Sequence, residues 1–349
     1  SKTAESQFRE IQRWLNVVDP ATNFSSALAV REPGTGNWLL EGRDYMDWKE
    51  GSGGVLWLHG IPRCGKSVLS ATAIEDVKRL CSMSDDHALA YFYFTFSDSQ
   101  KQNLANMLLS LIGQLLRARS DPVLPDEIMK LYHNSKAIGT SSSIKDLQTV
   151  FSHITKLSKK TFIILDALDE FPKDTRGSVL SWIGALMTDH DAGSLSMLVT
   201  SRPEADIVKS LEPLTNFSIS LQSKIIDPDI RVYIQNSLDS KDGFKEFTNE
   251  IRSEIEDTLV THSQGMYANT RSDMFRFRWV DCLLRILQEC MTPKAVRGAL
   301  KELPKDLDSV YSRILESIHK PQREYIQCAM HWLSFSAVPL TLAELAEAV

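Results

Sequence analysis

The amino-acid sequence predicts an α/β fold, in which a parallel β-sheet carries helices on both faces and is followed by a region made only of helices. Two observations support this prediction. Short apolar runs alternate with segments of helical periodicity as far as residue 221, and only helical periodicity follows. The first apolar run enters a glycine-containing loop that leads directly into a helical segment. This order is typical of a strand, loop and helix in a parallel sheet.

The predicted strands are short apolar runs bounded by turn-forming residues, at 55–59, 88–96, 161–165, 196–200 and 217–221. Helical periodicity before and between them covers 5–15, 67–80, 104–116, 144–157 and 179–187. The later helical segments are 229–238, 247–260, 279–289 and 307–318. A glycine-rich, turn-like stretch with Gly34, Gly36 and Gly51 to Gly54 precedes the first strand.

Composition narrows the classes of function. The chain has 349 residues, of which 43% are hydrophobic and 24% charged, so it can bury a large core and divide into several domains. A net charge of -6 gives no general attraction to nucleic acid or to an anionic membrane, so neither is an expected partner. No stretch approaches the ~20 apolar residues that cross a bilayer. The five cysteines are odd in number and form no CxxC pair, which favours reduced thiols and a cytoplasmic location.

The loop after the first predicted strand fits the pattern G-x-x-x-x-G-K-[ST]. Loop amides and the positive end of the next helix can surround the β-phosphate of a purine nucleoside triphosphate. Lys66 would bridge the β- and γ-phosphates, and Ser67 would ligate Mg²⁺ through its hydroxyl. The residues predicted to hold the nucleotide are Gly60, Ile61, Pro62, Arg63, Cys64, Gly65, Lys66, Ser67 and Val68. The alternative interpretation is a glycine turn with an incidental lysine.

Arg63 departs from the usual pattern, because P-loop ATPases generally have glycine at this position. If the position needs a positive φ, an L-residue costs about 1 kcal/mol, which would loosen the phosphate loop or speed nucleotide exchange. Alternatively, the guanidinium reaches a phosphate and compensates. We expect Arg63 to impair efficient hydrolysis more than it impairs nucleotide binding.

Three acids follow the apolar run 162–165, at the strand end where parallel sheets bind their ligands. Asp166 would hold Mg²⁺ through water, while Asp169 or Glu170 would orient or deprotonate the attacking water. A lone acid cluster after a strand is more often a helix cap. Its pairing with the upstream P-loop favours a Walker B motif instead.

Arg202 follows another predicted strand, in the run Thr200-Ser201-Arg202-Pro203-Glu204. Its planar guanidinium suits phosphate recognition, so it could sense the γ-phosphate from a neighbouring strand. The alternative is a surface arginine before a helix that starts at Pro203. The predicted catalytic set is therefore Lys66, Asp169, Glu170 and Arg202.

These three motifs together resemble those of the NACHT-type STAND NTPases, and specifically the fungal NOD-like receptors with a nephrocystin-3-like N-terminal domain. The resemblance covers most of the chain. Besides the motifs above, it is carried by Arg13-Trp14-Leu15, Gly34-Thr35-Gly36-Asn37-Trp38-Leu39, Leu56-Trp57-Leu58-His59, Leu303-Pro304-Lys305-Asp306-Leu307 and Pro339-Leu340-Thr341-Leu342-Ala343-Glu344-Leu345.

The resemblance implies a P-loop NTPase core followed by an all-α lid and a partial winged-helix region. The corresponding domains are an N-terminal, adenine-side lead-in over 1–50, the core over 51–222, a helical lid over 223–302 and the start of a winged-helix domain over 303–349. It also implies a slow NTPase that binds ATP or ADP with Mg²⁺. Exchange of ADP for ATP would open a closed monomer into a homo-oligomer that engages protein effectors in fungal non-self recognition or regulated cell death. The sequence identifies no effector and contains no recognisable C-terminal repeats.

Tyr267 to Met274 resembles an insertion, because fungal relatives run from Gly-Met directly into a Phe-Arg-Trp-like sequence. A shifted lid helix or an error in the gene model would explain it.

Two other functions stay open. Arg63 and the insertion favour a nucleotide-dead interaction module, whereas the P-loop alone is compatible with a phosphotransferase. The ~130 residues of helical sequence after the last strand exceed a simple lid, which argues against the phosphotransferase. No Asn/Thr-Lys-x-Asp motif follows the acidic run, which favours ATP over GTP.

Overall fold

The computed structural model describes residues 2–15, 18–62, 64–119, 125–138, 143–188, 194–221, 223–265, 276–304, 306–336 and 340–349. Arg63 and the stretch Tyr267 to Met274 lie outside these described residues. The chain divides into two compact units, Ser1–Gln222 and Ser223–Val349.

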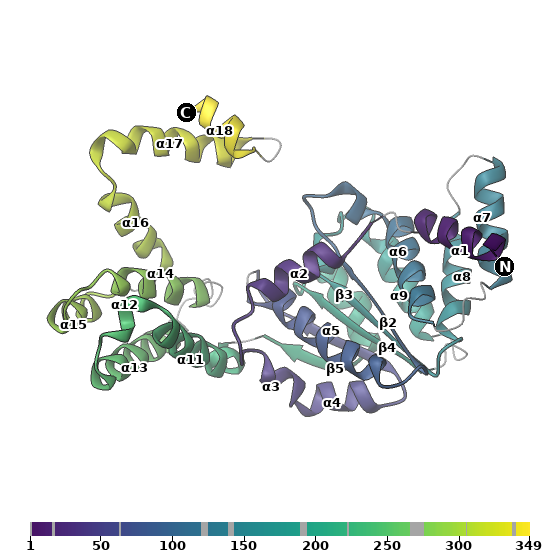
Figure 1. Ribbon diagram of the computed structural model, residues 1–349, viewed down its shortest axis with the longest axis horizontal. Coiled ribbons are helices and arrows are strands. Elements are labelled where there is room, and N and C mark those ends of the chain that lie inside the picture. Colours follow the sequence, from purple (N-terminus) through teal and green to yellow (C-terminus); the bar gives the residue numbers. More distant parts are fainter. Residues whose placement is uncertain are drawn as a thin grey trace. The chain divides into compact units, whose positions relative to one another are not determined.

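The first unit is built on a parallel sheet, whose described strands follow the order β2-β3-β4-β1-β5 (Figure 1). The strands are β1 (Gly54–His59), β2 (His87–Tyr93), β3 (Lys160–Asp166), β4 (Ser194–Ser201) and β5 (Thr215–Ser220). Each neighbouring pair of strands is parallel. Because β4 lies between β1 and β3, the loops that follow these three strands meet at one edge of the sheet.

Helices cover both faces of this sheet. One face packs against α2 (Ala21–Ala29), α3 (Asn37–Leu40), α4 (Arg43–Glu50) and α5 (Lys66–Ser82). On the other face, one apolar core joins the sheet to six helices: α1 (Lys2–Leu15), α6 (Leu104–Arg117), α7 (Asp126–Ile138), α8 (Ile144–Thr155), α9 (Arg176–Thr188) and α10 (Ala205–Leu211). Short 3-10 helices complete the unit: η1 (Ser99–Gln102), η2 (Leu168–Glu170) and η3 (Glu212–Leu214).

The third strand shows why the sequence pattern predicted two covered faces. Every residue of β3 is buried. Ile163 and Leu165 contribute to the core on one side of the sheet, whereas Phe162 and Ile164 contribute to the core on the other. A strand buried on both faces has a continuous apolar sequence rather than an alternating one. The predicted α/β fold is confirmed.

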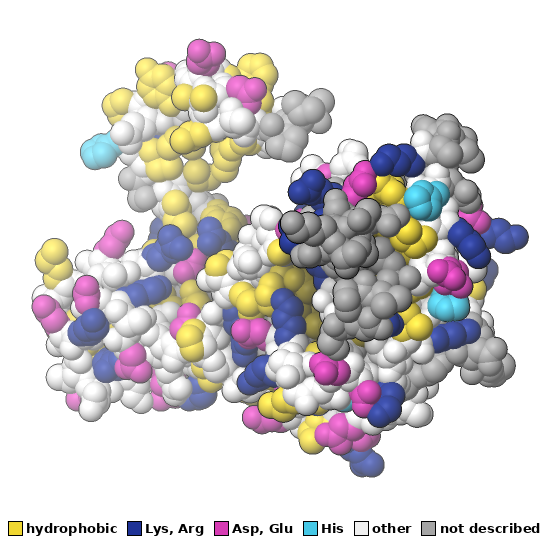
Figure 2. Space-filling model, turned by 45° about the vertical axis from the view of Figure 1, so that its right-hand side comes forward, with side chains coloured by type: hydrophobic (Ala, Val, Ile, Leu, Met, Phe, Trp, Pro, Cys, Tyr) yellow, Lys and Arg dark blue, Asp and Glu magenta, His cyan; other side chains and the backbone are white. Residues whose placement is uncertain are grey.

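The described elements of the second unit are helices. They are α11 (Ser223–Ser240), α12 (Asp242–Lys245), α13 (Asn249–Gly265), α14 (Arg276–Gln288), α15 (Pro293–Lys301), α16 (Leu307–Ser317), α17 (Lys320–Phe335) and α18 (Leu342–Ala348). A separate core joins α11 to α16, with Phe244 and Trp279 fully buried in it. In contrast, α17 and α18 expose large apolar side chains, including Trp332, Phe335 and Leu342. The space-filling view shows where hydrophobic side chains lie on the surface (Figure 2). Exposed apolar patches of this kind are commonly contact surfaces in proteins.

Several element boundaries differ from the sequence-based expectations. The run 88–96 was expected to be one strand, but β2 ends at Tyr93, and Thr95 and Ser97 form a turn closed by a 2.9 Å hydrogen bond between their hydroxyls. The glycine-rich stretch before β1 contains the helices α3 and α4. Helix α4 is short and polar, and only Tyr45 and Trp48 are buried in it, which is too weak a pattern to predict a helix. Among the described helices, none is long and apolar enough to cross a bilayer.

Candidate functional site

The predicted P-loop connects the carboxyl end of β1 to the start of α5. Its first residue is fixed to the neighbouring strand, since the Gly60 amide donates to the Ser201 carbonyl over 3.2 Å. A Cβ atom at Gly60 would lie 2.8 Å from Cys64 Sγ, so a side chain there would clash. Gly65 has a φ of 93°, which an L-residue rarely adopts. The two glycines of the motif are therefore required by close approach and by backbone conformation.

Lys66 is the first residue of α5, where the amide groups of the first turn have no partner within the helix. Such a helix start attracts anions. The Lys66 side chain is 8% exposed, and its Nζ donates to the carbonyls of Gly60 and Ile61 over 2.9 and 2.7 Å. Its ammonium group therefore lies inside the loop, next to the helix start.

Ser67 and Asp166 are in contact, although β4 lies between β1, which leads into the P-loop, and β3, which ends at Asp166. Ser67 Oγ donates to Asp166 Oδ2 over 2.6 Å, and Thr200 Oγ1 donates to Asp166 Oδ1 over 2.7 Å. Asp166 is buried, and this burial raises the pKa of its carboxyl, although the two hydroxyl donors and Lys66 oppose the shift. Hydroxyl and carboxylate oxygens are the hard ligands that Mg²⁺ prefers, so these two residues fit that ion.

The acidic loop after β3 begins with an unusual backbone conformation. Ala167 has a φ of 56°, in the left-handed region, and its amide donates to Thr200 Oγ1 over 2.9 Å. Left-handed backbone in a residue other than glycine is strained and occurs often at functional sites. Thr200 thus holds both Asp166 and the turn that follows it, a role that sequence reasoning missed.

Asp169 and Glu170 have different surroundings. Asp169 is 3% exposed and accepts from the Arg202 amide over 2.9 Å and from Arg202 Nε over 2.7 Å. Glu170 accepts from the Phe96 amide over 3.2 Å. Partial burial raises the pKa of the Glu170 carboxyl, and the Phe96 amide opposes that shift. The sequence left the water-activating role open between the two acids. The ion pair occupies Asp169, which leaves Glu170 as the better candidate.

Arg202 lies beside the predicted acids, as its place at the end of β4 suggested. The side chain is 43% exposed, and its Nε is paired with Asp169. This contact was not anticipated, since the sequence suggested only a phosphate as its partner. The guanidinium remains at the same edge of the sheet as the P-loop.

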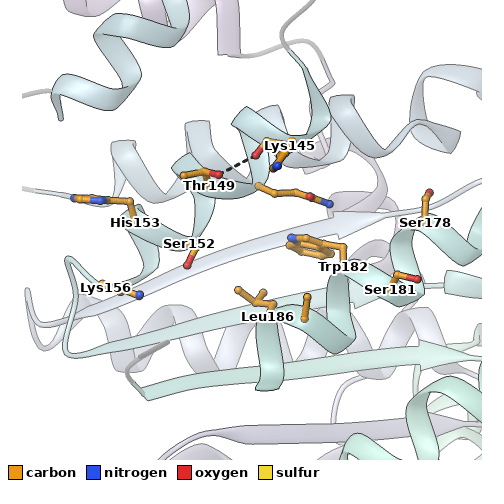
Figure 3. Close-up of a pocket in the computed structure, with 11 residues that line it drawn as sticks. Lys145, Thr149, Ser152, His153, Lys156, Ser178, Ser181, Trp182 and Leu186 are labelled. Carbon is orange, nitrogen blue, oxygen red and sulfur yellow. Dashed lines mark hydrogen bonds between the residues drawn. The ribbon is translucent and has the colours of Figure 1, made fainter. Parts of the chain in front are cut away.

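A groove between α8 and α9 is separate from this constellation. It has a volume of about 620 Å³ and is lined by residues that include Lys145, His153 and Trp182 (Figure 3). None of the predicted site residues lines it. The candidate site is therefore the edge of the sheet where β1, β3 and β4 end.

Comparison with known proteins supports the family resemblance. Residues 34–202 match the family described as nephrocystin 3, N-terminal. Over these residues the sequence is similar to that family. The matched segment contains the P-loop, the acidic loop and Arg202, so all the predicted site residues lie inside it.

One relative of this chain is vegetative incompatibility protein HET-E-1 from Podospora anserina. The two are 26% identical over 322 residues, which cover 89% of this chain and 22% of the relative. The chain thus spans about a fifth of that protein's length. The match confirms the resemblance to fungal proteins that the motifs indicated.

Two solved structures can be superposed on most of the chain at low similarity. One is Cdc6p from Pyrobaculum aerophilum, with a TM-score of 0.45 and 13% identity over 95% of this chain and 83% of that one. The other is ORC2 from Aeropyrum pernix in ADPNP–ADP complexes, with a TM-score of 0.44 and 12% identity over 93% of this chain and 78% of that one. Likeness at this level supports no conclusion about ligands or partners.

Proposed function

We propose that this chain binds ATP or ADP with Mg²⁺ and acts as a signalling switch that hydrolyses the nucleotide slowly. The observation that supports it best is the 2.6 Å hydrogen bond from Ser67 Oγ to Asp166 Oδ2. It joins the P-loop to the acid at the end of β3, and such a pair is the protein's share of a Mg²⁺–triphosphate site. Among the described residues, no group of three or more His, Cys, Asp or Glu side chains is arranged to hold a metal ion. That fits an ion whose other ligands are phosphate and water oxygens.

Each residue of the site has a role in this proposal. Lys66 exchanges its two carbonyl acceptors for oxygens of the β- and γ-phosphates. Glu170 orients or deprotonates the attacking water, because its carboxylate is held by a backbone amide and is not occupied by an ion pair. Asp169 holds Arg202, and Arg202 contacts the γ-phosphate through its exposed side. Mg²⁺, when bound, neutralises charge on the phosphate oxygens.

The signalling part of the proposal is supported by the relative's function in vegetative incompatibility and by the division into two units. In this proposal, residues 1–50 are the adenine-side lead-in and 51–222 the nucleotide-binding core. Residues 223–302 are the lid, and 303–349 begin a winged-helix domain. Exchange of ADP for ATP changes how the lid engages the core, and the opened protein assembles into homo-oligomers that engage effectors in the cytoplasm during fungal non-self recognition.

The test combines two measurements on the full chain. Mass spectrometry of the material released on denaturation should detect ADP or ATP, and light scattering should show a monomer with ADP and a larger species with MgATP. Ser67→Ala is the matched variant, and it should stay monomeric with MgATP. A protein that releases no nucleotide and stays monomeric in both states would favour a nucleotide-dead interaction module. Rapid transfer of phosphate to a small metabolite would favour a phosphotransferase.

A further inference from the structure

Arg176 is a buried arginine that sequence reasoning did not single out. It is the first residue of α9, and its side chain is 3% exposed. Nε donates to the Phe171 carbonyl over 3.1 Å, and Nη2 donates to the carbonyls of Asp169 and Phe171 over 2.6 and 3.0 Å. Nη1 donates to Glu204 Oε2 over 2.9 Å and to Asp206 Oδ2 over 3.1 Å. All three nitrogens of the guanidinium are thus engaged.

These acceptors belong to two segments of the chain: the acidic loop after β3, and the Arg202 loop, which runs from the end of β4 into the first turn of α10. The carbonyls are in the acidic loop after β3, which carries the carboxylates of Asp169 and Glu170. The carboxylates of Glu204 and Asp206 are in the segment that follows Arg202 at the end of β4. The same two loops are already joined by the ion pair between Asp169 and Arg202. Arg176 therefore forms a second connection between them.

We propose that Arg176 is a positioning residue that holds the acidic loop and the Arg202 loop together as one rigid unit. The proposal rests on the proposed function, because positioning is useful only if Glu170 and Arg202 act on a nucleotide. Arg176 makes none of the contacts of the P-loop or of Asp166, so it influences the rate of hydrolysis rather than nucleotide affinity. A displacement of about 1 Å in a catalytic group can cost roughly 100-fold in rate.

The shape of the arginine side chain is essential to this role. Its planar fork reaches backbone carbonyls on one side and carboxylates on the other at the same time. A lysine would keep the positive charge, but its compact ammonium cannot span both loops. Glu204 and Asp206 are 30% and 34% exposed, so water can solvate them when the arginine is replaced. The Arg176→Lys variant is therefore expected to fold.

The experiment compares Arg176→Lys with the wild-type chain in steady-state ATP hydrolysis and in MgATP binding. We expect kcat to fall about 10- to 100-fold while the Kd for MgATP stays within about twofold. Glu204→Gln weakens the same connection from its other end and should lower kcat less. The matched control is Arg297→Lys, since Arg297 contacts Glu254 through Nε and Nη2 on the surface of the second unit. That variant should retain wild-type kcat.

Amide hydrogen exchange without nucleotide separates this inference from the proposed function. In Arg176→Lys, exchange should accelerate together in 168–172 and 201–206, whether or not the protein hydrolyses ATP. Faster exchange confined to the start of α9, or an unchanged kcat in a folded variant, would overturn the positioning role. Equal losses in kcat and MgATP affinity would also contradict it. A wild-type chain with no hydrolysis but coupled exchange in both loops would refute the proposed hydrolysis and leave the mechanical link intact.

Discussion

Replacing Lys66 with alanine perturbs the site at the residue expected to contact the phosphates. In the protein without nucleotide, the change removes two hydrogen bonds to the carbonyls of Gly60 and Ile61. Bonds that involve a charged group contribute about 1.5–3 kcal/mol each, but relief of a buried charge offsets part of that loss. We therefore expect a modest fall in the free energy of unfolding, whichever way the function is resolved.

The effect on ligand protection is larger and more specific. At a nucleotide concentration of about 100 times Kd, binding stabilises the wild-type protein by about 2.7 kcal/mol. That is a rise of about 5–10 °C in Tm for a unit of this size. Loss of one charged phosphate contact weakens binding by about 1.5–3 kcal/mol, or roughly 10- to 150-fold. At the same MgATP concentration, protection should then fall below about 1.4 kcal/mol.

The assay is thermal unfolding of wild type and variant with and without MgATP. Lys160→Ala is a matched control, because Lys160 is also 8% exposed and its Nζ donates to two backbone carbonyls, those of Lys49 and Gly51. Lys160→Ala should lose stability but keep the full shift in Tm on adding MgATP. If Lys66→Ala kept the full shift as well, the assignment of the P-loop would be wrong.

Three further outcomes are expected near the acidic loop. Asp166→Asn should raise Tm at neutral pH. The pKa of the Asp166 carboxyl is raised in the folded protein above its ordinary value of 3.8, so the free energy of unfolding falls as pH rises from 3.8 through the folded pKa. The gain in Tm should therefore shrink in acid, and Mg²⁺-dependent protection by ATP should disappear, whereas a lower Tm at neutral pH would contradict this direction. Ala167→Gly should increase the free energy of unfolding by up to about 1 kcal/mol, measured by thermal unfolding. Glycine relieves the strain of the left-handed backbone, although it also increases the conformational entropy of the unfolded chain. Ala167→Val should destabilise the protein. The rate of ATP hydrolysis should fall in acid, because Glu170 must be ionised to act as base and its pKa lies above the 4.5 of an ordinary glutamate. Glu170→Gln should slow turnover about 100- to 10,000-fold and remove this fall in rate at low pH. An unchanged pH profile in the variant would exclude Glu170 as the base.

The sequence predicted strands such as β3 well because they are buried on both faces. A continuous apolar run such as Phe162 to Leu165 does not fit an amphipathic helix or a half-exposed strand. Its apolarity alone therefore indicates a buried strand and its approximate bounds. The short helices around the sheet are different. Helix α10, for example, buries only Ile207 and Leu211, and its polar residues gave no periodic signal. The end of β2 was placed too late because the aromatic run continues to Phe96, which is 73% exposed.

The candidate site was predictable where local motifs carry the chemistry. The P-loop and the acidic run each have a pattern, and parallel strands place their carboxyl ends at one edge. The pattern does not give strand order, so the separate contacts of Thr200 with Asp166 and of Arg202 with Asp169 could not be predicted. Thr200 and Asp166 are 34 positions apart, and no local spacing links them. Arg176 was missed for the same reason, since its carboxylate partners follow a different strand.

In the proposed function, Ser67 and Asp166 form a Mg²⁺-dependent nucleotide site. Isothermal titration of ATP into the nucleotide-free full chain, with and without Mg²⁺, tests it most directly. We expect one ATP to bind per chain, with an affinity that increases when Mg²⁺ is added to the wild-type protein, and we expect Ser67→Ala to lose that increase. No binding of ATP to the wild type, or an equal effect of Mg²⁺ in both proteins, would contradict it.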